Sequence, residues 1–99
     1  MLLTLEEARE LLRIDGTDND GIVQHTLAAA LGYLNTATGH DWSADATPDA
    51  VAKRAAAMLL IQWFEMPAGL AEGGAPPLTY GLTNLIKQLQ YRAREEGTP

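Results

Sequence analysis

The feature that most constrains this sequence is the segment from Ala55 to Phe64, in which Gln62 is the only polar residue. This pattern is typical of a helix that is apolar almost all round, and such a helix must be buried on more than one side. A chain of 99 residues has room for one modest hydrophobic core. We therefore expect a single helical domain, residues 1–99, with this segment at its centre or at the centre of an assembly.

Local signals predict two helices in the first half of the chain. Thr4 and Glu7 have the spacing of a capping box, and apolar residues then recur at helical intervals over Leu5–Arg13. A polar turn rich in Asp and Asn follows, in which Asp18 is a natural N-cap for the next helix. One apolar stripe then predicts a second helix at about Asn19–Thr38, ended by a glycine.

Two further helices are predicted in the second half. A cap at Thr47, followed by proline at the first helical position, predicts a third helix over about Pro48–Glu65. The composition of Pro67–Pro77 predicts a long Gly/Pro loop. Apolar residues at helical spacing then predict a fourth helix over about Thr79–Arg94. No strand signal is found, so the expected fold is all-α, a small bundle of about four helices with a long loop before the last one.

Acidic and basic residues are unevenly divided along the chain. The net charge is −6, from 7 Lys and Arg against 13 Asp and Glu. Residues 1–49 contain 9 of the acids and 2 of the bases, whereas residues 50–99 contain the remaining 4 and 5. The division has two interpretations: a solvated acidic surface, or head-to-tail association in which one subunit's acidic face meets the basic end of the next. The overall acidity disfavours binding to phosphate backbones.

No group of residues has the spacing of a catalytic, cofactor or metal site. The stretch Asp15–Gly21 superficially resembles a calcium loop, but placing its last glycine at the sixth position leaves Gly16 and Leu27 where carboxylates are needed. His25 and His40 have no third ligand or nucleophile at recognisable spacing, so they are expected at exposed or interface positions. We predict no catalytic, cofactor-binding or metal-binding residue, no cofactor and no enzymatic activity.

Further absences narrow the class of protein. Without cysteine there is no disulfide and no thiolate metal site, which fits a reducing compartment. Met1-Leu2-Leu3 leads into polar residues without a basic stretch or a long apolar run, so we expect no signal peptide. The longest uninterrupted apolar stretch is far shorter than the roughly 20 residues of a bilayer span, so no membrane partner is expected.

Several segments follow one another in a recognisable order: TLEEARELLRIDG, an Asp/Asn-rich turn, YLNTATGHDW, a helix that opens at Pro48 and closes with LLIQWFE, a Gly/Pro loop, and PLTYGLTNLI. Together they resemble the small head-tail connector proteins of tailed bacteriophages, also called the phage DNA-packaging or head-completion family. Thr38-Gly39-His40-Asp41-Trp42 is similar to the end of that family's second helix, with His40 at the usually basic position. Trp63-Phe64-Glu65 is similar to the end of its third helix, although this chain then turns at Met66-Pro67.

The resemblance implies a structural role without catalysis. It implies an all-helical subunit that assembles into a ring of about a dozen copies beneath the portal, extends the DNA channel and joins capsid to tail during DNA packaging and virion completion. The implied partners are further copies of the chain, the portal protein and a stopper or tail-completion protein, while DNA passes without sequence-specific binding. The implied location is the neck of the virion, after synthesis in the cytoplasm of the bacterial host.

A small helical DNA-binding regulator is the alternative function. Such a protein needs several cations on one exposed helix face, and no cation lies between Asn19 and Thr38.

Three regions are the predicted contact segments of the connector. We expect the apolar helix Val51–Phe64 to supply packing, with Trp63 in the core rather than at a binding hot spot. We expect the loop Pro67–Pro77 to become ordered on assembly. Basic residues of the last helix are expected to make inter-subunit contacts: Lys87, Arg92 and Arg94.

Overall fold

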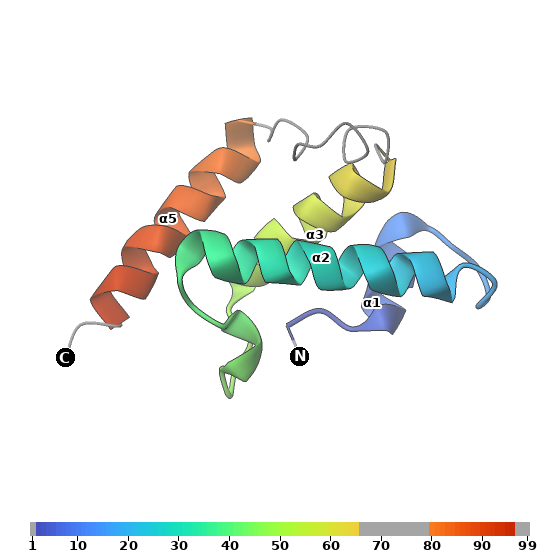
Figure 1. Ribbon diagram of the computed structural model, residues 1–99, viewed down its shortest axis with the longest axis horizontal. Coiled ribbons are helices and arrows are strands. Elements are labelled where there is room, and N and C mark those ends of the chain that lie inside the picture. Colours follow the sequence, from blue (N-terminus) through green and yellow to red (C-terminus); the bar gives the residue numbers. More distant parts are fainter. Residues whose placement is uncertain (1, 66–79, 97–99) are drawn as a thin grey trace.

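The computed structural model describes residues 2–65 and 80–96, which form a helical bundle (Figure 1). Its elements are α1 (Leu5–Leu12), α2 (Asp20–Thr38), the short 3-10 helix η1 (Trp42–Ala44), α3 (Ala50–Glu65) and α5 (Tyr80–Glu96). These two ranges contain no strand, and the predicted all-α fold is confirmed. No helix in them is both long and apolar enough to cross a bilayer. The predicted loop Pro67–Pro77 and the predicted helix start at Thr79 lie outside the described residues.

α2 and α3 form the centre of the bundle, and α1 and α5 lie toward its two ends. α2 packs against each of the other three α-helices, and α3 also contacts both α1 and α5. In Figure 1, α2 runs along the long axis in front of α3, with α5 at the left and α1 toward the right. Because α1 and α5 flank the same central pair, the two ends of the subunit present different surfaces.

α3 runs through the middle of the core. Its most enclosed side chains recur every three or four residues and form one broad face of the helix: Ala52, Ala55, Ala56, Leu59, Leu60 and Trp63. They share one core with Leu27 and Leu34 of α2 and with Leu82 and Leu89 of α5. The expectation that Trp63 is core is confirmed. The expectation that the helix is buried on more than one side holds only in part, because Met58, Ile61 and Phe64 outside this face are half-buried. Because one subunit already buries these side chains, the apolarity of α3 is not by itself evidence for assembly.

The residues before α1 also belong to the core. Leu2 and Leu3 are each 1% exposed, and the backbone N–H of Leu2 donates to Oγ of Ser43 at 3.4 Å. Two adjacent apolar residues carry no periodicity, so sequence reasoning did not predict their burial. Their contacts hold the start of the chain beside η1.

The turn between α1 and α2 differs from the prediction at both ends. α1 ends at Leu12, one residue early, because Arg13 adopts the left-handed conformation (φ 58°). The N-cap of α2 is Asn19, so the prediction of Asp18 is wrong. The backbone N–H of Asp20, the first residue of α2, donates to the carbonyl of Thr17 at 3.1 Å. Asp18 therefore lies inside a turn that closes directly before the helix.

The start of α3 also differs from the prediction, because its cap is Asp49. One carboxylate oxygen of Asp49 accepts from the backbone N–H groups of Val51 (2.9 Å) and Ala52 (3.0 Å), the amides that an N-cap satisfies. The prediction of a cap at Thr47 with Pro48 at the first helical position is therefore wrong. A carboxylate forms charge-assisted hydrogen bonds at the positive end of the helix, which a threonine hydroxyl cannot match.

Candidate functional site

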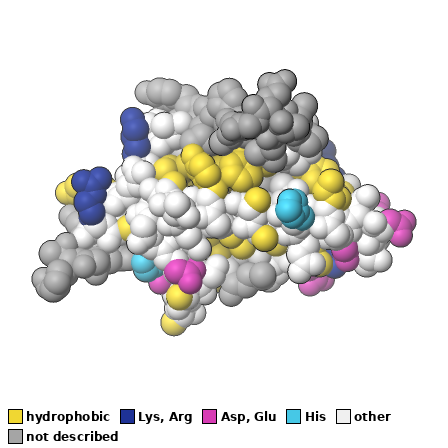
Figure 2. Space-filling view, in the orientation of Figure 1, with side chains coloured by type: hydrophobic (Ala, Val, Ile, Leu, Met, Phe, Trp, Pro, Cys, Tyr) yellow, Lys and Arg dark blue, Asp and Glu magenta, His cyan; other side chains and the backbone are white. Residues whose placement is uncertain are grey.

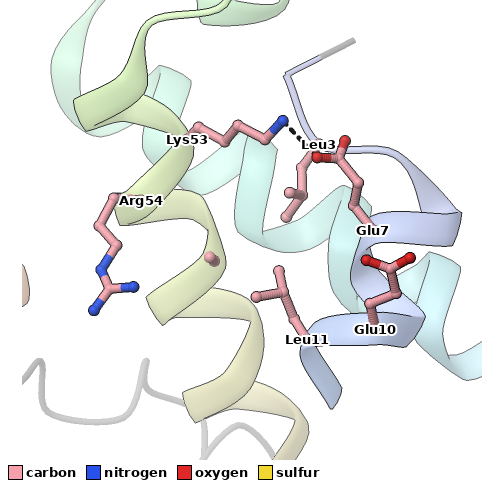
Figure 3. A pocket seen from close by; sticks show the side chains of 7 residues that line it. Leu3, Glu7, Glu10, Leu11, Lys53 and Arg54 are labelled. Carbon is pink, nitrogen blue, oxygen red and sulfur yellow. Dashed lines mark ion pairs between the residues drawn. The ribbon is translucent and has the colours of Figure 1, made fainter. Parts of the chain in front are cut away.

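An open groove of about 340 Å³ lies between α1 and α3 (Figure 3). Apolar side chains contribute to its lining: Leu3, Leu11 and Ala57. Charged side chains of both helices complete it: Glu7 and Glu10 of α1, and Lys53 and Arg54 of α3. Figure 3 shows Lys53 reaching toward Glu7, with which it forms an ion pair, whereas Arg54 points away from α1. A surface that combines apolar area with charges of both signs is typical of protein contacts.

Glu7 connects the start of α1 to this groove. Its backbone N–H donates to Oγ1 of Thr4 at 3.1 Å, and its carboxylate accepts from the backbone N–H of Thr4 at 3.1 Å, so the predicted capping box is confirmed. The hydrogen bond from Lys53, followed by that from the Thr4 amide, lowers the pKa of Glu7 below its ordinary value. Glu7 is therefore ionised at neutral pH, where it pairs with Lys53 across α1 and α3.

The chain turns back over the core after α2 through Trp42. Gly39 ends α2 in the left-handed conformation (φ 80°), which glycine adopts without strain. Trp42 is 1% exposed, and its Nε1–H donates to Oγ1 of Thr38 at 2.8 Å. Its backbone N–H donates to Oδ1 of Asn35 at 3.3 Å. We call residues 35–45 the α2–η1 corner. Its contacts attach the chain after α2 to the core, so this segment, which resembles the end of the connector family's second helix, stabilises the fold.

The two histidines lie in different environments. Nε2 of His40 is 2.9 Å from Oδ1 of Asp45, and the rings of His40 and Trp42 pack edge to face with their centroids 4.4 Å apart. His40 is thus half-buried among contacts of its own subunit and does not take the exposed one of its two expected positions, while the interface position stays a prediction. His25 is exposed on α2, as expected.

Arg92 binds Asp49 and so joins α5 to the start of α3. Its Nη1 donates to Oδ1 of Asp49 at 3.2 Å, and its Nη2 contacts Oδ2 of the same carboxylate. Sequence reasoning assigned Arg92 to contacts between subunits, whereas the structure gives its guanidinium a partner within the subunit. The same expectation for Lys87 and Arg94, which are exposed, stays a prediction.

Asp49 is expected to make stability depend on pH. Burial raises the pKa of Asp49, but hydrogen bonds from Arg92 and from two backbone amides outweigh burial and hold the pKa below its ordinary value of 3.8. The stabilisation is therefore fully present above the unfolded-state pKa and is lost as pH falls through the lower folded-state pKa. Asp49→Asn keeps a good N-cap residue but removes the charge, so it should reduce the loss of stability below about pH 4. Chemical denaturation at a series of pH values measures this loss.

Two matched variants separate the roles of Asp49. Asp49→Ala also removes the cap and should lose about a further 0.5–2 kcal/mol of unfolding free energy at neutral pH. Asp18→Asn changes an exposed carboxylate in the α1–α2 turn and should leave the acid sensitivity unchanged. An Asp49→Asn protein with the acid sensitivity of wild type would show that the Arg92 pair does not contribute.

The surface is charged at its ends and largely uncharged between them. In Figure 2, most of the visible Lys and Arg side chains lie at the α5 end, and Asp and Glu side chains gather at the opposite end and near η1. After Asp20, α2 contains no charged residue. Among the described residues, three large apolar side chains are exposed: Leu11 (37%), Ile22 (56%) and Tyr91 (63%). On this face basic side chains predominate at the α5 end, whereas Arg9, Lys53 and Arg54 lie beside acidic residues of α1 and α2 toward the other end.

The acidic turn between the first two helices has an electrostatic role within the fold. Oδ1 of Asp20 forms an ion pair with Nε of Arg9 at 3.1 Å, and this pair links the start of α2 to α1. Within residues 2–65 and 80–96, no three His, Asp or Glu side chains are grouped to hold a metal ion.

Sequence reasoning missed both the groove and Tyr91. Glu10 and Arg54 lie on helices far apart in the chain, so no local pattern brings them together. Tyr91 did carry a usable signal, because it lies off the apolar stripe that Leu82, Ile86 and Leu89 form on α5. An aromatic residue on the solvent side of a helix is a candidate contact residue.

A family model matches most of the chain. The model is that of the phage gp6-like head-tail connector proteins, and it matches residues 2–72. The matched range contains α1, α2, η1 and α3, while α5 lies after it. Neither the curated proteins nor the solved structures include a significant match to this chain.

Proposed function

The chain belongs to the phage gp6-like head-tail connector family, and we propose on that basis that it is the repeated subunit of a ring beneath the portal of a tailed bacteriophage. About a dozen copies would extend the DNA channel and join capsid to tail during DNA packaging and virion completion. The partners are neighbouring copies, the portal protein on one side and a stopper or tail-completion protein on the other. The protein acts through contact surfaces in the neck of the virion, without catalysis.

The observation that carries this proposal is the family match over residues 2–72. Both helices that form the groove lie inside the matched range, and so does the α2–η1 corner. The match therefore covers side chains that hold the fold as well as side chains that remain open to contact. Basic side chains on α5 and acidic ones on α1 support head-to-tail association, since complementary surfaces on different sides of a subunit generate rings when the rotation closes.

The acidity of the chain supports a channel through which DNA slides. A net charge of −6 gives the protein little affinity for phosphates and, on a channel wall, repels them. A regulator that reads DNA would need cations along an exposed helix, and α2 has none along its length. The charge of this chain thus favours the connector over the regulator.

The proposal predicts oligomers that form under defined conditions. At high concentration, alone or mixed with the portal protein of the same phage, the purified protein should form closed rings in negative-stain images and a native mass of many subunits. Association should weaken as salt rises, because screening reduces attraction between the charged ends. Bovine serum albumin in place of the portal protein is a suitable control for nonspecific adhesion.

Two results would oppose the connector role. A protein that stays monomeric alone and does not bind the portal contradicts it directly. Retardation of duplex DNA in a gel at moderate salt would instead support the DNA-binding regulator.

A further inference from the structure

Two exposed apolar side chains lie on different surfaces of the subunit. Leu11 belongs to the groove between α1 and α3 and is 37% exposed, and Tyr91 of α5 is 63% exposed. Large aromatic side chains supply much of the energy of protein contacts when a pocket on the partner encloses them. Tyr91 is therefore a candidate contact residue, and the groove is a surface with room to accept a side chain.

We infer that the α1–α3 groove of one subunit receives Tyr91 and Lys87 of a neighbouring copy. The inference rests on the proposed function, because it names the surfaces through which the ring would form. Arg92 is not needed for this contact, since its guanidinium already binds Asp49 within its own subunit.

Shape and apolarity support this pairing. The groove has a volume of about 340 Å³, ample for one aromatic ring, and Leu3, Leu11 and Ala57 give it apolar lining. A tyrosine suits such an open groove because its ring contacts the apolar side chains while its hydroxyl stays near water or the polar walls.

Charge supports the same orientation. Lys87 lies four residues before Tyr91 on α5, so the two exposed side chains occupy one helix face. Glu10 directly precedes Leu11 at the groove and is exposed. Neither Glu10 nor Lys87 has an ion-pair partner within the described part of the chain, in contrast to Glu7 and Lys53, which pair with each other. Seating Tyr91 beside Leu11 places Lys87 near Glu10, a pairing of opposite charges.

The position of the two surfaces makes the contact head-to-tail. α1 and α5 lie toward opposite ends of the long axis in Figure 1, so a subunit cannot readily place its own Tyr91 in its own groove. Each subunit then offers one groove and one α5 face, and each contact uses a different surface from each partner. Such a heterologous contact repeats from copy to copy, as a ring requires.

A charge-exchange experiment tests the pairing of Glu10 with Lys87. Glu10→Lys and Lys87→Glu each put like charges together and should weaken self-association about tenfold or more in sedimentation measurements. An equal mixture of the two variants should restore association, because alternating subunits give every contact one positive and one negative side chain. Asp18→Lys makes the same change in net charge as Glu10→Lys, but outside the groove, and should have a much smaller effect. Circular dichroism verifies that each variant is folded.

A second experiment uses the absence of cysteine from the natural chain. The double variant Glu10→Cys, Lys87→Cys should form a ladder of disulfide-linked oligomers on mild oxidation, since each subunit has one thiol for each neighbour. Each single variant should show no disulfide-linked ladder under the same conditions. A mixture of the two single variants should form disulfide-linked dimers. Tyr91 is retained in all of them.

The outcomes separate this inference from the proposed function. Association of wild type, alone or on the portal, with no effect of charge exchange and no ladder overturns the groove contact but leaves the connector role intact. Failure of wild type to associate with itself or with the portal overturns both.

Discussion

Trp42→Ala is expected to lower the free energy of unfolding by about 3–5 kcal/mol. Trp42 is 1% exposed, so the substitution opens a cavity where the α2–η1 corner covers the core. It also removes the donor that binds Thr38 at 2.8 Å and the ring edge that contacts His40. Small domains are stable by about 5–15 kcal/mol, so this loss is a large share of the total. Urea denaturation followed by far-UV circular dichroism measures it.

Two further variants isolate the cause. Trp42→Phe retains a buried ring but loses the Nε1–H group, so its loss should be clearly smaller than that of Trp42→Ala. Tyr91→Ala removes an exposed aromatic side chain and should leave the unfolding free energy of the monomer within about 0.5 kcal/mol of wild type. A Trp42→Ala protein as stable as the Tyr91→Ala protein would disprove the role of the corner.

Leu59→Ala is the second large effect, with an expected loss of about 2–5 kcal/mol. Leu59 is 0% exposed in the middle of α3, where the core leaves no side free to relax toward solvent. Trp63→Ala should lose a similar amount, because Trp63 is 5% exposed and meets the edge of Tyr33 with ring centroids 5.2 Å apart. Thermal and urea unfolding of both proteins provide the measurement.

Ile61, a half-buried residue of α3, is the comparison for Leu59. Ile61→Ala removes a branched apolar side chain from the same helix, but part of its site is open to water, so the loss should be smaller than for Leu59→Ala. Unchanged melting temperatures for both Leu59→Ala and Trp63→Ala would refute the placement of α3 at the centre of the core.

Short-range signals predicted most of the helices. The capping box of Thr4 and Glu7 started α1 where expected, and Gly39 ended α2 where expected. These signals succeed because caps and left-handed residues act within one helical turn. The same reasoning failed at Asp18 and Thr47, since several polar residues competed for each cap and only the path of the chain selects one of them.

Contacts between distant residues could not be predicted in the same way. Asp49 lies 43 residues before Arg92, and its carboxylate serves both the cap of α3 and the ion pair with α5. Nothing near either residue indicates the other. Sequence reasoning therefore assigned Arg92 only to contacts between subunits, whereas the packing of α5 against α3 brings it to Asp49.

The sequence by itself determined the all-α fold, the burial of one face of the segment from Ala55 to Phe64, and the resemblance to head-tail connectors that the family match confirms. Helical periodicity and capping are local, and an apolar segment must leave water wherever it folds. Only the tertiary structure decided what that segment packs against. Its buried side chains share one core with residues of α2 and α5 from the same subunit. It also decided where contact surfaces remain. The groove and the exposed face of α5 exist only because packing brings α1 beside α3 and leaves Tyr91 in solvent.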